Sequence, residues 1–229
     1  MHQQIDKKHK YILLFIIFLF LTTISNLKLS KNLNSLSNIK DLQVLGLSHN
    51  LNQKIKDKIG ILLNQNIFFI SDGFIKENLN EYNYLESFDV FKIFPSKLII
   101  NLKQTSFLAN TIKDNQKYIV GSNGKLIDYK IINLNLDIPN IFGNFPKKDF
   151  ITFFNTIKES RFDYNDIEDI FYFKSGRWDI KTKLGIFVKL PKNEVKIALN
   201  KAQNIITNPR IDYKVIDLRI ANQVIVSDE

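Results

Sequence analysis

The sequence predicts an α+β protein with one N-terminal apolar anchor and a folded part outside the cytoplasm. One uncharged apolar run lies close to the N-terminus, at residues 11–24. After it, stretches with the 3.6-residue period of helices alternate with stretches that have the two-residue period of strands. Asn123-Gly124 between two apolar runs is typical of a tight hairpin, so the larger sheet is expected to be mostly antiparallel.

Composition limits the classes of function. The 229 residues are 45% apolar and include no Cys, which excludes disulfides, thiolate zinc sites and cysteine nucleophiles. The formal charge is +9, but the lysines are scattered among Asp and Glu. A nucleic-acid interface would favour clustered Arg. We therefore expect a basic, well-solvated surface, with neither nucleic acid nor a small-molecule substrate as partner.

The apolar run predicts a transmembrane anchor over residues 11–27, with Tyr11, Phe15, Phe18 and Ile24 in lipid. A helix of this length rises about 25 Å, against a hydrocarbon core of roughly 30 Å. Flanking lysines can extend their charged groups to the interfaces. A cleaved signal peptide is the alternative, although Thr23-Ile24-Ser25 is a poor cleavage pattern.

The basic residues around the anchor predict its orientation. Lysines lie on both sides of it, so the positive-inside count is nearly balanced. The tight group of Lys7, Lys8 and Lys10 resembles the start of a signal sequence, and it places the tail of residues 1–10 in the cytoplasm. A linker rich in Ser and Asn follows at residues 28–38.

Residues 39–104 predict a small domain of strand, helix, helix, strand and strand, with both helices on one face of the sheet. Apolar residues at helical spacing and a Ser or Asp cap define the helices, and alternation defines the strands. The expected elements are a strand at 41–47 ending near Gly46, a helix carrying Leu51, Ile55, Ile59 and Leu62, a helix capped by Ser71 or Asp72 and carrying Ile75 and Leu79, and strands at 85–94 and 98–102.

Residues 105–229 predict a second, larger α+β domain. The expected strands are at residues 118–120, 126–127, 167–173, 178–182, 186–190, 213–218 and 224–226. A helix is expected at 149–160, burying Phe150, Phe153 or Phe154, and Ile157. A second is expected from an Asn193 cap to residue 206, burying Ala198, Leu199, Ala202 and Ile205.

No pattern of residues in the sequence indicates catalytic chemistry. His49 is the one histidine after the anchor, and a lone histidine in an expected loop indicates a solvated residue. The carboxylates of residues 163–169 lack the spacing of a calcium loop and indicate a solvated turn. Trp178 is expected in the core or on a sheet face. We predict no catalytic, metal or cofactor-binding residue; an anchored hydrolase using a carboxylate pair within residues 163–169 stays as the alternative.

The order of the elements and a series of short motifs resemble the FtsQ (DivIB) family of bacterial cell-division proteins. The likeness covers nearly the whole chain, and the order and spacing of the motifs carry it. These motifs are Val44-Leu45-Gly46, Asn66-Ile67-Phe68, the segment from Val90 to Leu98, Ala109, Asn123-Gly124, Pro139 with Gly143, Trp178 with Gly185 and Leu190-Pro191, and Ile216-Asp217-Leu218-Arg219. Lys92, Phe94 and Gln104 stand where the family has Arg, Trp and Glu.

The resemblance implies a POTRA domain at 39–104 and the β domain of the family at 105–229. It implies a non-enzymatic divisome scaffold of the cell inner membrane, active in septation, with the bulk of the chain periplasmic. Its hairpin would carry Lys92, Phe94 and Pro95. Another POTRA-type membrane assembly or translocation module is the alternative.

The implied partners are the FtsB–FtsL pair, bound by strand addition at the C-terminal edge. Val224, Ile225 and Val226 are strongly β-prone and lie close to the end of the sequence, where a terminal strand can accept an incoming one. An interior strand with an acidic cap is the other interpretation of the same residues. The implied partner-binding residues are Arg219, Ile220, Gln223, Val224, Ile225 and Val226.

Overall fold

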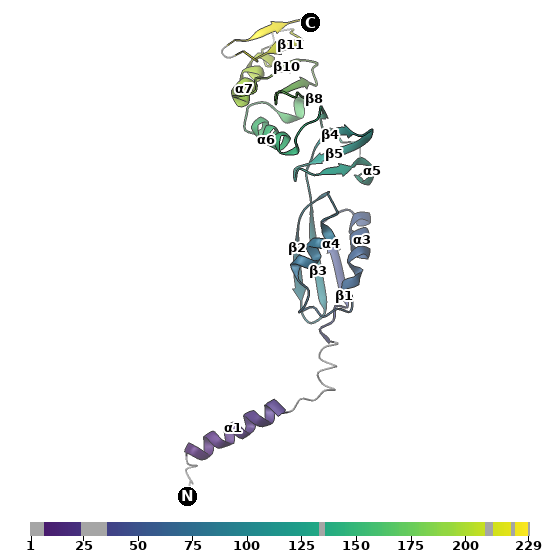
Figure 1. Cartoon of the computed structure of the whole chain (residues 1–229), viewed down its shortest axis with the longest axis vertical. Coiled ribbons are helices and arrows are strands. Elements are labelled where there is room, and N and C mark those ends of the chain that lie inside the picture. The colour runs from purple at the N-terminus through teal and green to yellow at the C-terminus, as the bar shows by residue number, and fades with distance from the viewer. Residues whose placement is uncertain (1–6, 24–35, 133–135, 209–212, 221–222, 229) are drawn as a thin grey trace. The chain divides into compact units, whose positions relative to one another are not determined.

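A computed structural model of the chain describes residues 7–23, 36–132, 136–208, 213–220 and 223–228 (Figure 1). Two compact units make up the chain: Met1–Asn80 with Phe88–Leu102, and Glu81–Ser87 with Lys103–Glu229. The start of the expected cytoplasmic tail, residues 24–27 of the expected anchor with Ile24, and most of the expected linker lie outside the described residues.

The N-terminal apolar run forms α1, a helix of 17 residues at Lys7–Thr23. Every large apolar side chain from Tyr11 to Leu21 is exposed, by 46% to 72%. Within the described ranges, no helix combines the length and the apolar character needed to cross a membrane. The transmembrane anchor therefore stays a prediction.

The first unit contains the expected sequence of strand, helix, helix, strand and strand. A three-stranded sheet has the order β1-β3-β2, and β1 pairs parallel with β3. In that register Leu42 lies beside Leu98 and Val44 beside Ile100, so one face of the sheet is apolar. The elements are β1 at Asp41–Leu45, α3 at His49–Lys58, the 3-10 turn η1 at Ile59–Leu62, α4 at Asp72–Leu79, β2 at Leu85–Ile93 and β3 at Lys97–Gln104.

The helices of this unit follow the predicted pattern. Ile55, Ile59 and Leu62 are buried, although α3 ends before Ile59 and a 3-10 turn carries the last two. Of the two expected caps, Ser71 is the one used: its Oγ accepts the backbone N–H of Phe74 at 3.2 Å. His49 is the first residue of α3 and not a loop residue, and it is exposed, as a solvated histidine should be.

The second unit is built on a nine-stranded mixed sheet with the order β12-β11-β10-β9-β8-β7-β4-β5-β6. The pairs β10–β11, β4–β7 and β7–β8 are parallel, and the other neighbours are antiparallel. The strands are β4 at Phe107–Lys113, β5 at Gln116–Gly121, β6 at Leu126–Asp128, β7 at Asn140–Phe142, β8 at Ile167–Tyr172, β9 at Trp178–Thr182, β10 at Phe187–Lys189, β11 at Val215–Asp217 and β12 at Ile225–Ser227.

Two helices cover the same side of this sheet, α6 at Lys147–Lys158 and α7 at Val195–Ile206 (Figure 1). They share one core with Trp178, Ile180 and Val188. Shorter helices lie at Tyr129–Ile132 (α5) and Tyr164–Asp166 (η2). The core position of Trp178 is as predicted: it is 5% exposed and stacks on Phe153 at a ring distance of 4.8 Å.

Some details of the second unit differ from the prediction. Asn193 does not cap α7; Glu194 holds that position, with a left-handed φ of 56° and without a side-chain cap. Ile205 is partly buried. Strands β4 and β7, and the helix α5, were not predicted. The last two strands are three residues each, shorter at β11 and displaced by one residue at β12.

Candidate partner-binding site

The last strand, β12, lies at one edge of the nine-stranded sheet. It pairs antiparallel with β11, with Ile216 opposite Val226 and Asp217 opposite Ile225. In the part of the chain that the structure describes, β11 is its single neighbour. Val226 packs towards the core, while Ile225 is 50% exposed. A short strand with one face packed and one edge open is suited to accept another strand.

Arg219 and Asp217 hold the chain in place where it leaves β11. The backbone N–H and Nε of Arg219 donate to Oδ1 of Asp217 at 3.0 and 2.9 Å. Hydrogen bonds from Arg219 are the main cause that lowers the pKa of Asp217 below its ordinary value. Further on, the N–H of Gln223 donates to the carbonyl of Ile220 at 3.2 Å. Local bonds therefore fix Arg219 to the last residue of β11 and Gln223 to Ile220.

A groove of about 710 Å³ lies between the start of α7 and the segment that joins β11 to β12. Its walls combine basic and apolar side chains: Ile197 and Ile220 are each 52% exposed. Among the described residues that line the groove, Glu194 is the single acid. These residues are Pro191, Lys192, Asn193, Glu194, Ile197, Ala198, Lys201, Leu218, Arg219, Ile220 and Gln223. Such a groove can hold an apolar segment with acidic side chains.

The structure brings the six predicted partner-binding residues into one region. Arg219, Ile220 and Gln223 line the groove, and Val224, Ile225 and Val226 lead into and form β12. Val224 is 43% exposed.

The predicted hairpin residues belong to the first unit. Nζ of Lys92 donates to the carbonyl of Ile70 at 2.6 Å, and the ring of Phe94 stacks on Phe68 at 4.8 Å. Pro95 is exposed at the turn between β2 and β3. Of the predicted anchor residues, Tyr11, Phe15 and Phe18 are exposed on α1.

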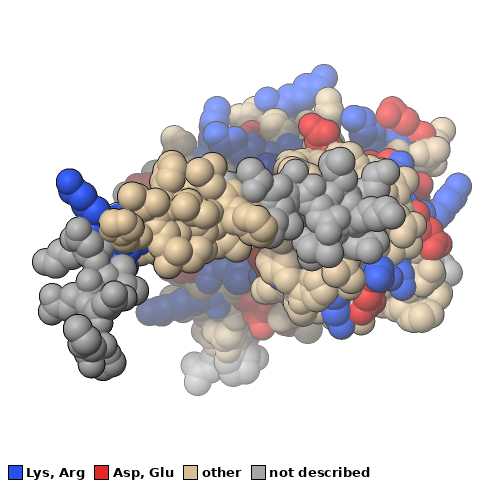
Figure 2. Space-filling model, turned by 90° about the horizontal axis from the view of Figure 1, so that it is seen from below, with Lys and Arg blue, Asp and Glu red and all other residues tan. Residues whose placement is uncertain are grey.

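The carboxylates of residues 163–169 serve local structure. Asp163 accepts the N–H of Asn165 at 2.9 Å, and Lys181 pairs with Glu168 at 2.8 Å and with Asp169 at 3.8 Å. Among the described residues, no three His, Asp or Glu side chains gather in a way that could hold a metal ion. Figure 2 shows basic and acidic side chains mixed on the face that it presents.

An ion pair between the buried Asp179 and the half-buried Arg177 was not predicted from the sequence. Asp179 is 2% exposed; its Oδ1 accepts Nε of Arg177 at 3.1 Å and the N–H of Leu190 at 3.1 Å. The carboxylate thereby fixes the end of β10, to which β11 is paired. The sequence does contain a sign of this pair. Asp179 lies within the strand β9, two residues after Arg177, and a carboxylate that is buried in a strand needs a partner for its charge.

The Asp217–Arg219 pair predicts a pH dependence at the edge of the sheet. Because the pKa of Asp217 is lowered in the folded state, its contribution is present above the unfolded value of about 3.9 and is lost as the pH falls through the folded pKa. The protection of the β12 amides, measured as the hydrogen-exchange rate relative to the intrinsic rate at the same pH, should therefore fall below about pH 4. Asp217→Asn should abolish this acid dependence, whereas Asp137→Asn, which changes an exposed partner of Lys183, should leave it intact.

The chain thus combines a small β-α-α-β-β unit with a second unit built on a mixed sheet. Comparison with known families identifies both parts. Residues 37–104 match the model of the FtsQ-type POTRA domain, and residues 110–219 match that of the C-terminal domain of the cell division protein FtsQ/DivIB. The chain belongs to the FtsQ/DivIB family of cell division proteins.

Three relatives carry the same description. Cell division protein DivIB of Clostridium tetani is 24% identical over 164 residues, which cover 72% of this chain and 54% of that protein. DivIB of Bacillus cytotoxicus is 29% identical over 41% of this chain and 36% of its own length. DivIB of Clostridium botulinum is 28% identical over 46% and 41%. The chain thus spans about half or less of the length of these curated relatives.

Proposed function

We propose that the chain is a non-enzymatic scaffold of the cell-division machinery that binds a protein partner by strand addition at β12. The observation that carries this is the open edge of β12, with Ile225 half exposed beside a basic, partly apolar groove. Edge addition supplies main-chain hydrogen bonds, and the groove supplies side-chain selectivity. The resemblance to the family names the FtsB–FtsL pair as the expected partner.

The proposal also includes membrane anchoring through the N-terminal run. The uncharged sequence continues past α1 to Leu27, with Ile24 and Leu27 as its last apolar residues, and residues 11–27 would span about 25 Å as a helix. The exposure of all large apolar side chains from Tyr11 to Leu21 supports lipid as their surroundings. In this arrangement the anchor stays uncleaved, with its N-terminus in the cytoplasm and the two units outside.

The binding proposal is tested by a charge at the edge. Ile225→Glu should weaken binding of the FtsB–FtsL pair at least tenfold, because a carboxylate would have to lose its hydration beside the incoming strand. Binding is measured by surface plasmon resonance on the full chain in nanodiscs. Circular dichroism checks that the fold is intact.

Ile112→Glu is the matched control, because Ile112 is an exposed isoleucine (64%) on β4, well separated from β12 in the order of the sheet. It should leave the affinity within a factor of two. Equal affinity of the Ile225→Glu protein and the unchanged chain, with the sheet intact, would exclude β12 as the contact.

A further inference from the structure

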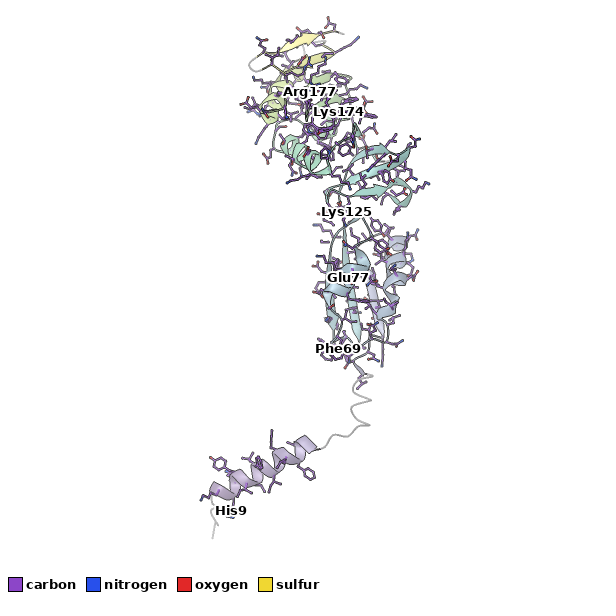
Figure 3. The ribbon with its side chains drawn as sticks, viewed as in Figure 1. His9, Phe69, Glu77, Lys125, Lys174 and Arg177 are labelled. Carbon is purple, nitrogen blue, oxygen red and sulfur yellow. The ribbon has the colours of Figure 1, made fainter. Side chains whose placement is uncertain are left out.

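Three exposed phenylalanine side chains lie at one end of the first unit. Phe68, Phe69 and Phe94 are 62%, 86% and 55% exposed. Phe68 and Phe94 stack on each other with an interplanar angle of 25°, and the Lys92 to Ile70 hydrogen bond ties their two loops together. We call these three residues the aromatic tip. Figure 3 labels Phe69 at the end of the domain.

The aromatic tip lies where the chain arrives from its N-terminal side. The carbonyl of Ser37 accepts the N–H of Ile67, the residue before Phe68, at 2.9 Å. The N–H of Lys40 donates to the carbonyl of Ser96, two residues after Phe94, at 2.8 Å. Leu36, at the start of this arriving segment, is 51% exposed. The same end of the domain therefore receives the chain and presents its aromatic rings.

The chain length between α1 and this end restricts how far the tip can lie from the apolar helix. Only residues 24–35 separate Thr23 from Leu36. Even fully extended, such a segment reaches no further than about 45 Å. Since the segment arrives beside the tip, this length is the upper limit on the distance between the tip and the end of α1.

The chemistry of the tip favours a lipid surface. Phe and Leu side chains bury readily at the boundary of head groups and acyl chains, and lysines beside them attract anionic lipids. Lys40 is exposed and Lys92 is half buried at the same end, while Lys97 is neutralised by Asp41 at 3.3 Å. The acidic residue that follows the tip most closely in the sequence is Asp72, at the start of α4. The charges named at this end of the domain are therefore mainly basic.

We propose that the aromatic tip docks on the bilayer beside the anchor. The POTRA unit is then seated on the membrane surface by Phe68, Phe69 and Phe94. This inference rests on the proposed membrane anchoring and extends it to a second contact. Docking of the tip would restrict the orientations that the first unit can adopt relative to the membrane.

The absence of Cys allows single-site labelling of the full chain. Phe69→Cys, Phe15→Cys and Glu77→Cys are labelled with an environment-sensitive fluorophore and reconstituted in vesicles of phosphatidylcholine and phosphatidylglycerol that carry a lipid quencher. Glu77 is exposed on α4, and Figure 3 shows it further along the domain than Phe69. We expect strong quenching at position 15, and at position 69 several times the quenching found at position 77.

The outcomes separate the two proposals. Quenching at position 15 with position 69 as weak as position 77 would overturn docking and leave the anchor standing. No quenching at position 15 would overturn membrane anchoring, and docking with it. Shielding of position 69 that needs added FtsB–FtsL, without lipid quenching, would make the tip a protein contact and also overturn docking.

A second variant excludes an effect of the fluorophore itself. In the Phe69→Cys protein, changing Phe68 and Phe94 to Ser should at least halve the quenching at position 69. Phe91→Ser is the matched control, because Phe91 is 51% exposed on β2 and takes no part in the stacked pair. Equal quenching in both proteins would contradict a role of the tip in docking.

Discussion

Trp178→Ala is expected to lower the free energy of unfolding of the second unit by about 3–5 kcal/mol. The indole is 5% exposed and is the centre of an aromatic cluster on the helix-covered side of the sheet. Phe153 stacks on it at 4.8 Å, and Tyr172 and Phe150 contact it at 4.5 and 6.1 Å between ring centroids. Alanine leaves a large cavity that the neighbouring rings, held on α6 and β8, cannot fill. Urea unfolding followed by circular dichroism measures the loss.

The same change should reach the proposed binding edge. Asp179, the next residue, accepts the N–H of Leu190, and β10 in turn pairs with β11, which holds β12. Loosening β9 therefore weakens the support of the edge, and partner binding should fall together with stability. Leu184→Ala, at a turn residue 77% exposed, should cost less than about 0.5 kcal/mol. A loss below 1 kcal/mol for Trp178→Ala would show that the aromatic cluster can close over the missing ring.

Helical periodicity made much of the second unit predictable. Phe150, Phe153 and Ile157 recur at helical spacing, and α6 buries all three. Hairpins were predictable for a local reason as well: Gly124 adopts a φ of 71° in the turn between β5 and β6, as Asn-Gly favours. Strand pairs that are consecutive in the sequence, such as β5 and β6, can therefore be predicted from local residue patterns.

Strand β7 shows where local patterns fail. It has three residues, Asn140–Phe142, and pairs parallel with both β4 and β8, which are distant in sequence. Such a strand is stabilised by its two neighbours and needs no alternation of its own. β4 was missed for a related reason: Asn110 and Thr111 interrupt its apolar residues, and Thr111 donates its hydroxyl hydrogen to the carbonyl of Ile141 on β7 at 3.1 Å.

The candidate site was predictable in its residues but not in its geometry. A β-prone run close to the end of the sequence indicated a strand near Ile225. Its position at the edge depends on the crossover through α7, which sets β11 parallel to β10. The aromatic tip could not be found from spacing, because Phe68 and Phe94 meet only when the two loops of the folded domain come together.

Gly46→Ala is expected to destabilise the first unit by about 3 kcal/mol or more, since a left-handed backbone and an overpacked contact each cost about 1–3 kcal/mol. Gly46 directly follows β1 with a φ of 102°, and a Cβ there would lie 1.9 Å from the carbonyl oxygen of Leu102 on β3. This explains why the chain needs glycine at the end of its first strand: β1 lies against β3 at this point, and no side chain fits between them. Hydrogen exchange of the amides of β1 and β3 measures the effect within this unit.

Gly60→Ala is the matched control, because a Cβ at Gly60 meets no atom within 4 Å and the backbone there is not left-handed. It should change the stability by less than about 0.5 kcal/mol, in either direction. If both substitutions had the same small effect, the close approach of β1 to Leu102 would not constrain the fold. If Gly46→Ala alone loosened β1 and β3, the Val-x-Gly motif would be a packing requirement of the POTRA sheet and need no functional explanation.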